Sequence, residues 1–312
     1  MYPAVVVKEV VVVKEMVPPS PLIFDRRLLR AHRARAAALG PSTFLLERVA
    51  EDLSDRLAAV LRQFDRAVDL GTPTEAVGRA LAASGKVGAV IRAADGCYGQ
   101  TVGLVADEEA LPFRDGTLDL LVSALSLQFV NDLPGALVQI RRALKPDGLF
   151  LAALIGGDTL TELRQAFAAA EAEIEDGISP RVAPFADVRD IGALLQRAGL
   201  ALPVTDADRL TVRYASPIAL MHDLRRMGAT NPLAERSRRP LRRKTLRRML
   251  EIYAERFADR DGRVRATFEI IWLSGWAPHE SQQKPLAPGS ARQRLADALG
   301  VKEVPAGDKA GR

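Results

Sequence analysis

The spacing of apolar residues along the chain switches repeatedly between a helical and a strand-like period. Residues 42–61 place an apolar residue every three or four positions, which predicts an amphipathic helix with Ser42 as its N-cap. The apolar run at 67–70 is short and ends at Gly71, as a buried strand before a turn does. Runs of the same kind predict further strands at 87–91, 101–105, 118–123, 149–154, 211–214 and 264–272.

Helices are expected between several of these strands. Asn131-Asp132 precede a helical run, and the Lys-Pro-Asp-Gly sequence at 145–148 ends it. Thr159 and Glu162 have the spacing of a capping box before another helix, and Gly199 ends the helix that follows. Strands that alternate with helices predict an α/β protein with a doubly wound sheet and helices on both faces.

The domain organisation follows from the absence of a long flexible linker. The chain of 312 residues has no segment rich enough in proline, glycine or serine to separate two domains, so we expect one main domain at 22–280. Residues 215–262 form a helical insertion in it, and 281–312 form a C-terminal tail. Residues 1–21 contain two similar hexamers, VVVKEV at 5–10 and VVVKEM at 11–16, and we expect a disordered tail or a mis-assigned start upstream of Met16.

The overall composition excludes several classes of protein. A net charge of +5 and a pI of about 9.5 favour acidic partners but do not specify nucleic acid. The single cysteine, Cys97, excludes an intramolecular disulfide and a cysteine-rich metal site, and it indicates a reducing compartment. No run approaches the ~18 apolar residues that a membrane span needs. These features predict a cytoplasmic protein without a membrane span.

The turn after the first strand gives the first chemical signal. Asp69-Leu70-Gly71 stands where doubly wound folds bind nucleotides, outside the carboxyl ends of the strands. Taken alone the signal is weak, because a buried strand that ends in Asp-x-Gly is as often a plain turn. Three further segments strengthen it, since they follow in order at tight spacing: ADEEALPF at 106–113, LDLLVS at 118–123 and LKPDG at 144–148.

These segments resemble the third, fourth and fifth strand regions of class I S-adenosylmethionine-dependent methyltransferases. From about Ile23 to Ser290 the chain is similar, more closely, to the complex I assembly-factor (arginine hydroxylase) family of that fold. The motifs that carry this resemblance are IFDR at 23–26, SLQFVNDLP at 126–134, GGDTL at 156–160 and GWAPHESQ at 275–282. The chain also resembles the malonyl-carrier-protein methyltransferases of biotin synthesis, which have Gln-Trp where this chain has Gln128-Phe129.

The resemblance implies both a fold and a function. The fold is a Rossmann-like, doubly wound sheet of seven strands, with N-terminal helices over the cofactor side. The function is hydroxylation of an arginine on an iron–sulfur subunit of respiratory complex I, which would be the partner and would bring the protein to the periphery of the inner membrane. Two alternatives stay open: a methyltransferase acting on a small molecule or a carrier protein, and a non-catalytic assembly scaffold.

The same resemblance implies where S-adenosylmethionine would bind. Asp69 and Gly71 would line the methionine end of the cofactor, and Asp107 and Glu108 would lie beside the adenine. Residues 123–128, beginning with Ser123, would form the floor of the pocket. A solvated turn is the alternative interpretation of Asp107 and Glu108.

Two positions depart from the pattern of the family. Where glycines are expected after Asp-Leu-Gly, residues 72–75 read Thr-Pro-Thr-Glu; Pro73 removes a backbone donor and Glu75 adds a negative charge. The predicted second strand ends in Ile91-Arg92 instead of an acid for the ribose, and Asp95 comes too late. We therefore hypothesise that the fold is kept but that the cofactor binds poorly or not at all.

No catalytic residue is specified by the sequence. Gln128 and His279 are weak candidates, and the alternative for His279 is a structural histidine near the last strand. The three histidines lack the spacing of a facial iron triad, so no metal site is predicted.

A strongly basic segment extends over Arg236–Arg248. One interpretation is a solvated helical face; the other is a docking surface for an acidic protein, which salt would weaken. Nucleic acid is not expected as a partner, because no aromatic residues interleave with the basic ones.

Overall fold

A computed structural model describes residues 22–98, 103–175, 177–283 and 295–302. The chain divides into two compact units, Met1–Pro278 and His279–Arg312. The predicted N-terminal tail at 1–21 lies outside the described residues, as does most of the predicted C-terminal tail. The described part of the second unit includes a short helix, α9 (Leu295–Leu299).

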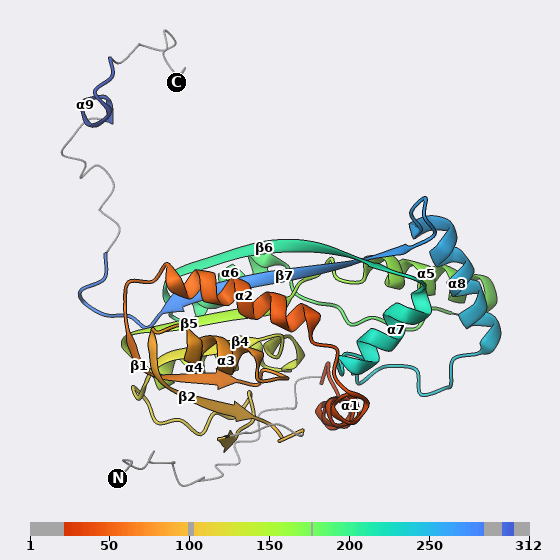
Figure 1. Ribbon diagram of the computed structural model, residues 1–312, viewed down its shortest axis with the longest axis horizontal. Helices are drawn as coiled ribbons and strands as arrows, with labels where there is room; N and C mark the ends of the chain where they lie inside the picture. Colours follow the sequence, from red (N-terminus) through yellow and green to blue (C-terminus); the bar gives the residue numbers. More distant parts are fainter. Residues whose placement is uncertain (1–21, 99–102, 176, 284–294, 303–312) are drawn as a thin grey trace, which may run out of the picture. The chain divides into compact units, whose positions relative to one another are not determined.

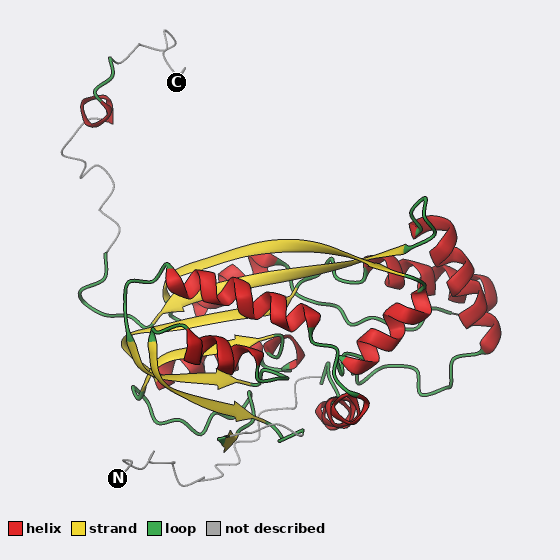
Figure 2. Ribbon diagram, viewed as in Figure 1, coloured by secondary structure: helices red, strands yellow, loops and turns green. Residues whose placement is uncertain are grey.

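The first unit contains a seven-stranded sheet with the order β3-β2-β1-β4-β5-β7-β6, shown in Figures 1 and 2. The strands from β3 to β5 are parallel, and β7 runs antiparallel to both of its neighbours. This sheet confirms the predicted doubly wound α/β fold. The strands are β1 (Phe64–Leu70), β2 (Val87–Ala94), β3 (Leu104–Val105), β4 (Leu118–Ala124), β5 (Leu144–Ile155), β6 (Ala201–Tyr214) and β7 (Val264–Trp276).

Helices cover both faces because the central strands are apolar on both sides. Ala67 and Leu120 pack into one core with α2 and α3, whereas their neighbours Val68 and Leu121 pack into a second core with α4 and α6. The helices of the first unit are α1 (Arg26–Leu39), α2 (Phe44–Ala58), α3 (Ala76–Ala83), α4 (Leu133–Ala143), α5 (Thr161–Ile174), α6 (Val188–Arg197), α7 (Pro217–Arg226) and α8 (Arg243–Phe257), with a 3₁₀ turn η1 (Leu127–Phe129). Among the described residues, every helix is too short or too polar to cross a bilayer.

Helices α7 and α8 lie between β6 and β7 in the chain and join the first core. Helix α8 packs along α5, and α7 contacts α1, so this end of the molecule gathers helices from three distant parts of the sequence (Figure 1). Phe268 of β7 and Tyr253 of α8 are fully buried here. The long β6–β7 pair therefore positions a helical layer beside the carboxyl ends of the central strands.

Some local predictions were wrong. The capping box at Thr159 and Glu162 does not form, because both side chains bind β7 instead: the Thr159 hydroxyl accepts from the backbone N–H of Glu269 at 2.9 Å, and Glu162 accepts from Thr267. The N-cap of α2 is Thr43 and not Ser42. The prediction at residues 131–132 was confirmed, since the Asp132 carboxylate accepts from a backbone N–H of α4.

Candidate functional site

The candidate site lies at the carboxyl ends of β1, β2 and β4. The chain leaves β1 toward β2 on one side, and β4 lies on the other side of β1, so the strand order reverses at this point. A crevice forms where crossover connections diverge in this way, and polar groups on the strand ends face it.

Gly71 turns the chain directly after β1. Its φ of +71° is one that side chains other than glycine rarely adopt, and a Cβ here would lie 2.4 Å from Ser126 Oγ and 2.6 Å from Glu108 Oε1. Only glycine fits, and the backbone of the turn comes close to the two polar side chains.

Asp69 is buried at the end of β1 and pairs with Arg92, its register partner on β2. Arg92 Nε lies 3.3 Å from Asp69 Oδ2. Burial raises the pKa of Asp69 to about 6, although the Thr72 hydroxyl and the Arg92 guanidinium both favour the ionised form. Asp69 Oδ2 is therefore already bound by Arg92 of the same chain.

Arg92 also holds the loop that should carry the glycines. Its Nη2 donates to the carbonyl oxygens of Thr72 at 3.3 Å and Thr74 at 2.9 Å, and its Nη1 lies 3.6 Å from Glu75 Oε1. Because Pro73 has no N–H and Glu75 is anionic, the loop presents carbonyl oxygens and a carboxylate where an anionic ligand would need donors.

The expectation that Asp95 comes too late was wrong. Strand β2 extends to Ala94, three residues beyond the predicted end, because Ala93 pairs with Leu70 of β1 and residues 93–94 pair with β3. Asp95 is therefore the first residue after the strand, and its side chain is almost completely buried. It accepts from Arg30, Arg33 and the Tyr98 hydroxyl.

Asp107 and Glu108 follow β3 and face the same crevice. Glu108 is fully buried: it accepts from Ser126 Oγ at 2.6 Å and forms an ion pair with Arg26. Burial alone would raise the pKa of Glu108, but Arg33, Arg26 and the Ser126 hydroxyl outweigh it and lower the pKa. A solvated turn is therefore the wrong interpretation for Glu108, while Asp107 keeps a third of its side chain exposed.

Three arginines of α1 supply the counter-charges of this acid cluster. Arg26 binds Asp107 and Glu108, Arg30 binds Asp95 and Asp107, and Arg33 binds Asp95 at 3.1 Å. Arg33 also donates to Ser126 Oγ at 3.1 Å. Arg30 and Arg33 were not predicted from the sequence. Their signal was the spacing of residues 26, 30 and 33, which places three cations on one helical face.

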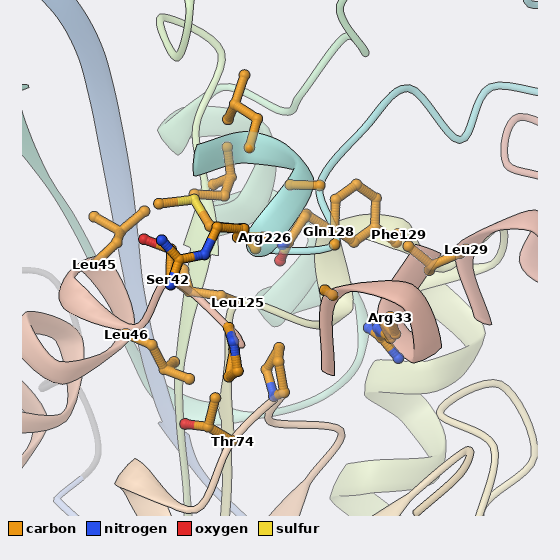
Figure 3. Close-up of a pocket in the computed structure, with 18 of the residues that line it drawn as sticks. Leu29, Arg33, Ser42, Leu45, Leu46, Thr74, Leu125, Gln128, Phe129 and Arg226 are labelled. Carbon is orange, nitrogen blue, oxygen red and sulfur yellow. The ribbon is translucent and has the colours of Figure 1, made fainter. Parts of the chain in front are cut away.

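A cavity adjoins the crevice, with Arg33, Pro73 and Tyr98 in both walls. Figure 3 shows Leu45 and Leu46 of α2 on one side of it and Leu29 and Phe129 on the other. Gln128 of η1 lies in this wall, and its buried Oε1 has no hydrogen-bond partner in the described structure.

The remaining candidates are not part of the acid cluster. Ser123 is buried on β4, and no partner for its Oγ is found in the described residues. His279 belongs to the second unit, where it is exposed and its Nδ1 lies 2.6 Å from Ser281 Oγ. Cys97 is an exposed free cysteine. Within the described ranges no group of His, Cys, Asp and Glu side chains could hold a metal ion.

Comparisons with known proteins place this geometry in a family. Residues 67–152 match the methyltransferase domain family. The mitochondrial arginine-hydroxylase NDUFAF5 of Homo sapiens is 41% identical over 281 residues, which cover 86% of this chain and 81% of that protein. The malonyl-acyl-carrier-protein O-methyltransferase of Gallionella capsiferriformans is 33% identical and covers 82% of this chain and 92% of that protein.

Solved structures agree on the fold. The crystal structure of the YcgJ protein of Bacillus subtilis superposes with a TM-score of 0.50 at 15% identity, over 74% of this chain and 99% of that chain. The identity with the human protein over most of both chains leads to one conclusion. This chain belongs to the arginine-hydroxylase NDUFAF5 family and carries a methyltransferase domain.

Proposed function

We propose that the crevice binds S-adenosylmethionine and that the protein modifies an arginine of a respiratory complex I subunit. The identity with arginine-hydroxylase NDUFAF5 over most of both chains is the observation that carries this proposal. The domain at 22–280 would then act as a single catalytic unit, in the cytoplasm and at the periphery of the inner membrane.

The residues present fit the nucleoside half of the cofactor. Asp95 follows β2 and can accept from ribose hydroxyls, and Asp107 follows β3 and can accept from the adenine amine. Because α1 pairs with both acids, cofactor binding requires Arg30 and Arg33 to give up or share these contacts.

The residues fit the methionine half less well. Pro73 removes one backbone donor and Glu75 adds a carboxylate, and Arg92 uses its guanidinium on Asp69 and the loop carbonyls. Loss of one hydrogen bond to a charged group, at about 1.5–3 kcal/mol, lowers affinity by roughly one to two decades. The proposed function therefore includes a weakened cofactor site, as the sequence suggested.

A basic surface beside α8 is the proposed contact for the complex I subunit. Within Arg236–Arg248, four exposed cations have no partner in the described structure: Arg238, Arg239, Arg243 and Lys244. The other members bind acids of this chain; Arg236 binds Asp25, and Arg248 binds Glu173. Unpaired cations on one surface favour an acidic protein.

A methyltransferase acting on a small molecule or a carrier protein is the second candidate. It is favoured by the 33% identity with malonyl-acyl-carrier-protein O-methyltransferase and by the cavity beside the crevice. Among its described lining residues, this cavity has no carboxylate to hold a substrate arginine. A non-catalytic scaffold is the third candidate, and it requires that the cofactor does not bind at all.

Two experiments separate these candidates. Calorimetric titration of the purified chain with S-adenosylmethionine should show binding that Asp95→Asn weakens at least tenfold and that Asp55→Asn, at an exposed position of α2, leaves unchanged. Mass spectrometry of complex I from a gene-deletion strain should show an arginine that lacks one oxygen atom. Binding without that loss favours the second candidate, and absence of binding favours the scaffold.

A further inference from the structure

The cavity next to the crevice has a mainly apolar lining. It measures about 120 Å³, and α1, the α1–α2 loop, α2, η1 and α7 all contribute to its wall. Leu45, Leu46, Leu224 and Phe268 make much of the lining apolar. Burial of an apolar chain against such walls is favourable, in proportion to the apolar area that is removed from water.

The charges in the wall are all positive. Among the described residues that line the cavity, Arg33 and Arg226 are the charged ones, and no aspartate or glutamate is present. Arg33 is already neutralised by Asp95 and Glu108. A guanidinium or ammonium group that entered the cavity would find no counter-charge there, so the wall disfavours cationic ligands.

Arg226 is the cation that remains available. It ends α7 and is exposed, and its Nε donates to the carbonyl oxygen of Gly40 at 2.7 Å. No interaction of its two Nη groups is found in the described structure. The bond to Gly40 fixes the guanidinium at the α1–α2 loop, where Pro41 and Ser42 also line the cavity, and leaves a planar pair of donors that matches a carboxylate.

A second cavity of about 270 Å³ extends the apolar space. It shares Phe129, Leu160, Phe185, Leu224 and Ala229 with the first, and no carboxylate is found among the lining residues that the structure describes. Phe129 and Phe185 stand edge to face between the two, with 6.2 Å between ring centroids. The space beyond the first cavity is therefore also suited to an apolar chain.

The geometry points to a binding site for a long-chain carboxylate, with its head group on Arg226 and its chain along Leu45, Leu46, Leu224 and Phe268. This inference goes beyond the proposed function, because it concerns a ligand of the neighbouring cavity and does not depend on cofactor binding. Gln128, whose Oε1 lacks a partner, adds a neutral acceptor for a hydroxyl or amide on such a chain.

The test compares three single-chain ligands of equal length on the purified full-length protein. Dodecanoate and dodecylamine are titrated by calorimetry below their critical micelle concentrations, and dodecanol is titrated below its solubility limit. Dodecanoate should bind saturably with one site per chain, at least tenfold more tightly than dodecylamine, and its affinity should fall about three- to fourfold for each methylene removed.

Variants assign the site. Arg226→Gln should weaken dodecanoate about tenfold without changing dodecanol, whereas Arg225→Gln, at the exposed neighbouring position, should change neither. Ala37→Phe, which fills the cavity from α1, should abolish binding, and the exposed Ala38→Phe should not. Thermal unfolding of each variant checks its fold.

Equal affinity for dodecylamine, or unchanged dodecanoate binding in Arg226→Gln, would overturn the inference. A parallel titration with S-adenosylmethionine keeps the two proposals separate. Loss of cofactor binding with dodecanoate binding intact counts against the proposed function alone, and the reverse result counts against the carboxylate site alone.

Discussion

Arg33 of α1 and Asp95 at the end of β2 form an ion pair, with 3.1 Å between Nη1 and Oδ1, and both side chains are almost completely buried. The pair fastens the first helix to the sheet end where a cofactor would bind. Because Arg33 also lines the neighbouring cavity, one residue touches the acid cluster and both hollows of the site. The stability of the fold and the properties of the site are therefore coupled through α1.

Removing the charge of Glu108 should destabilise the protein. Glu108→Gln leaves Arg26 with Asp107 alone, and breaking a buried pair by removing one partner costs about 3–5 kcal/mol. Urea unfolding at pH 7 measures the loss, with Glu51→Gln at an exposed position of α2 as the matched control. A change within the range of the control would mean that the acid cluster does not fasten α1.

The stabilisation by the Glu108–Arg26 ion pair should depend on pH. The pKa of Glu108 is lowered on folding, so its contribution is fully present above the ordinary value of 4.5 and is lost as the pH falls below it. The stability difference between the wild-type protein and Glu108→Gln should shrink as the pH falls below about 4.5. A difference that stays constant on acidification would contradict this assignment.

The contribution of Asp69 to stability should change with pH in the opposite direction. Its pKa rises from 3.8 to about 6 on folding, so the folded state binds the proton more tightly, and stability falls as the pH rises from about 4 to about 6. Asp69→Asn removes this slope, although it leaves Arg92 without the carboxylate at every pH. In urea unfolding, the stability of Asp69→Asn relative to the wild-type protein should increase between about pH 4 and about pH 6. Above about pH 6 the difference should stay constant. A gap independent of pH would refute the shift.

Restoring glycines to the loop after β1 should improve cofactor binding. Pro73→Gly with Glu75→Gly returns a backbone donor and removes a carboxylate, so S-adenosylmethionine should bind at least tenfold more tightly in calorimetry. Arg79→Gly, on the exposed side of α3, tests whether flexibility near the loop has the same effect. Unchanged affinity in the double variant would show that this loop does not face the bound ligand.

Charge reversal on the basic surface should weaken binding of the partner protein. Arg239→Glu with Lys244→Glu should reduce co-purification with complex I subunits and remove most of the salt dependence of that association. Arg79→Glu, an exposed cation elsewhere in the first unit, is the matched control. If control and double variant lose association equally, net charge and not this surface is responsible.

The sequence predicted the fold because periodicity is a local property. Each of the apolar runs of β1, β4 and β5 is a short continuous segment of the chain. Their alternation with helices indicates a parallel sheet before any contact is known. Family motifs such as the one at 126–134 extended this to the strand count and to the side of the sheet on which ligands bind.

The composition of the site was decided only by tertiary structure. Residues 26, 30 and 33 are far in the chain from Asp95, Asp107 and Glu108, and no local pattern says that the two sets meet. The end of β2 was likewise set by pairing: residues 93–94 join the sheet because β1 and β3 supply partners, and this places Asp95 at the crevice. The local sequence determines the spacing of apolar residues and the residues that form turns. The pairing of charges that are 62 or more residues apart depends instead on how the helices pack on the folded sheet.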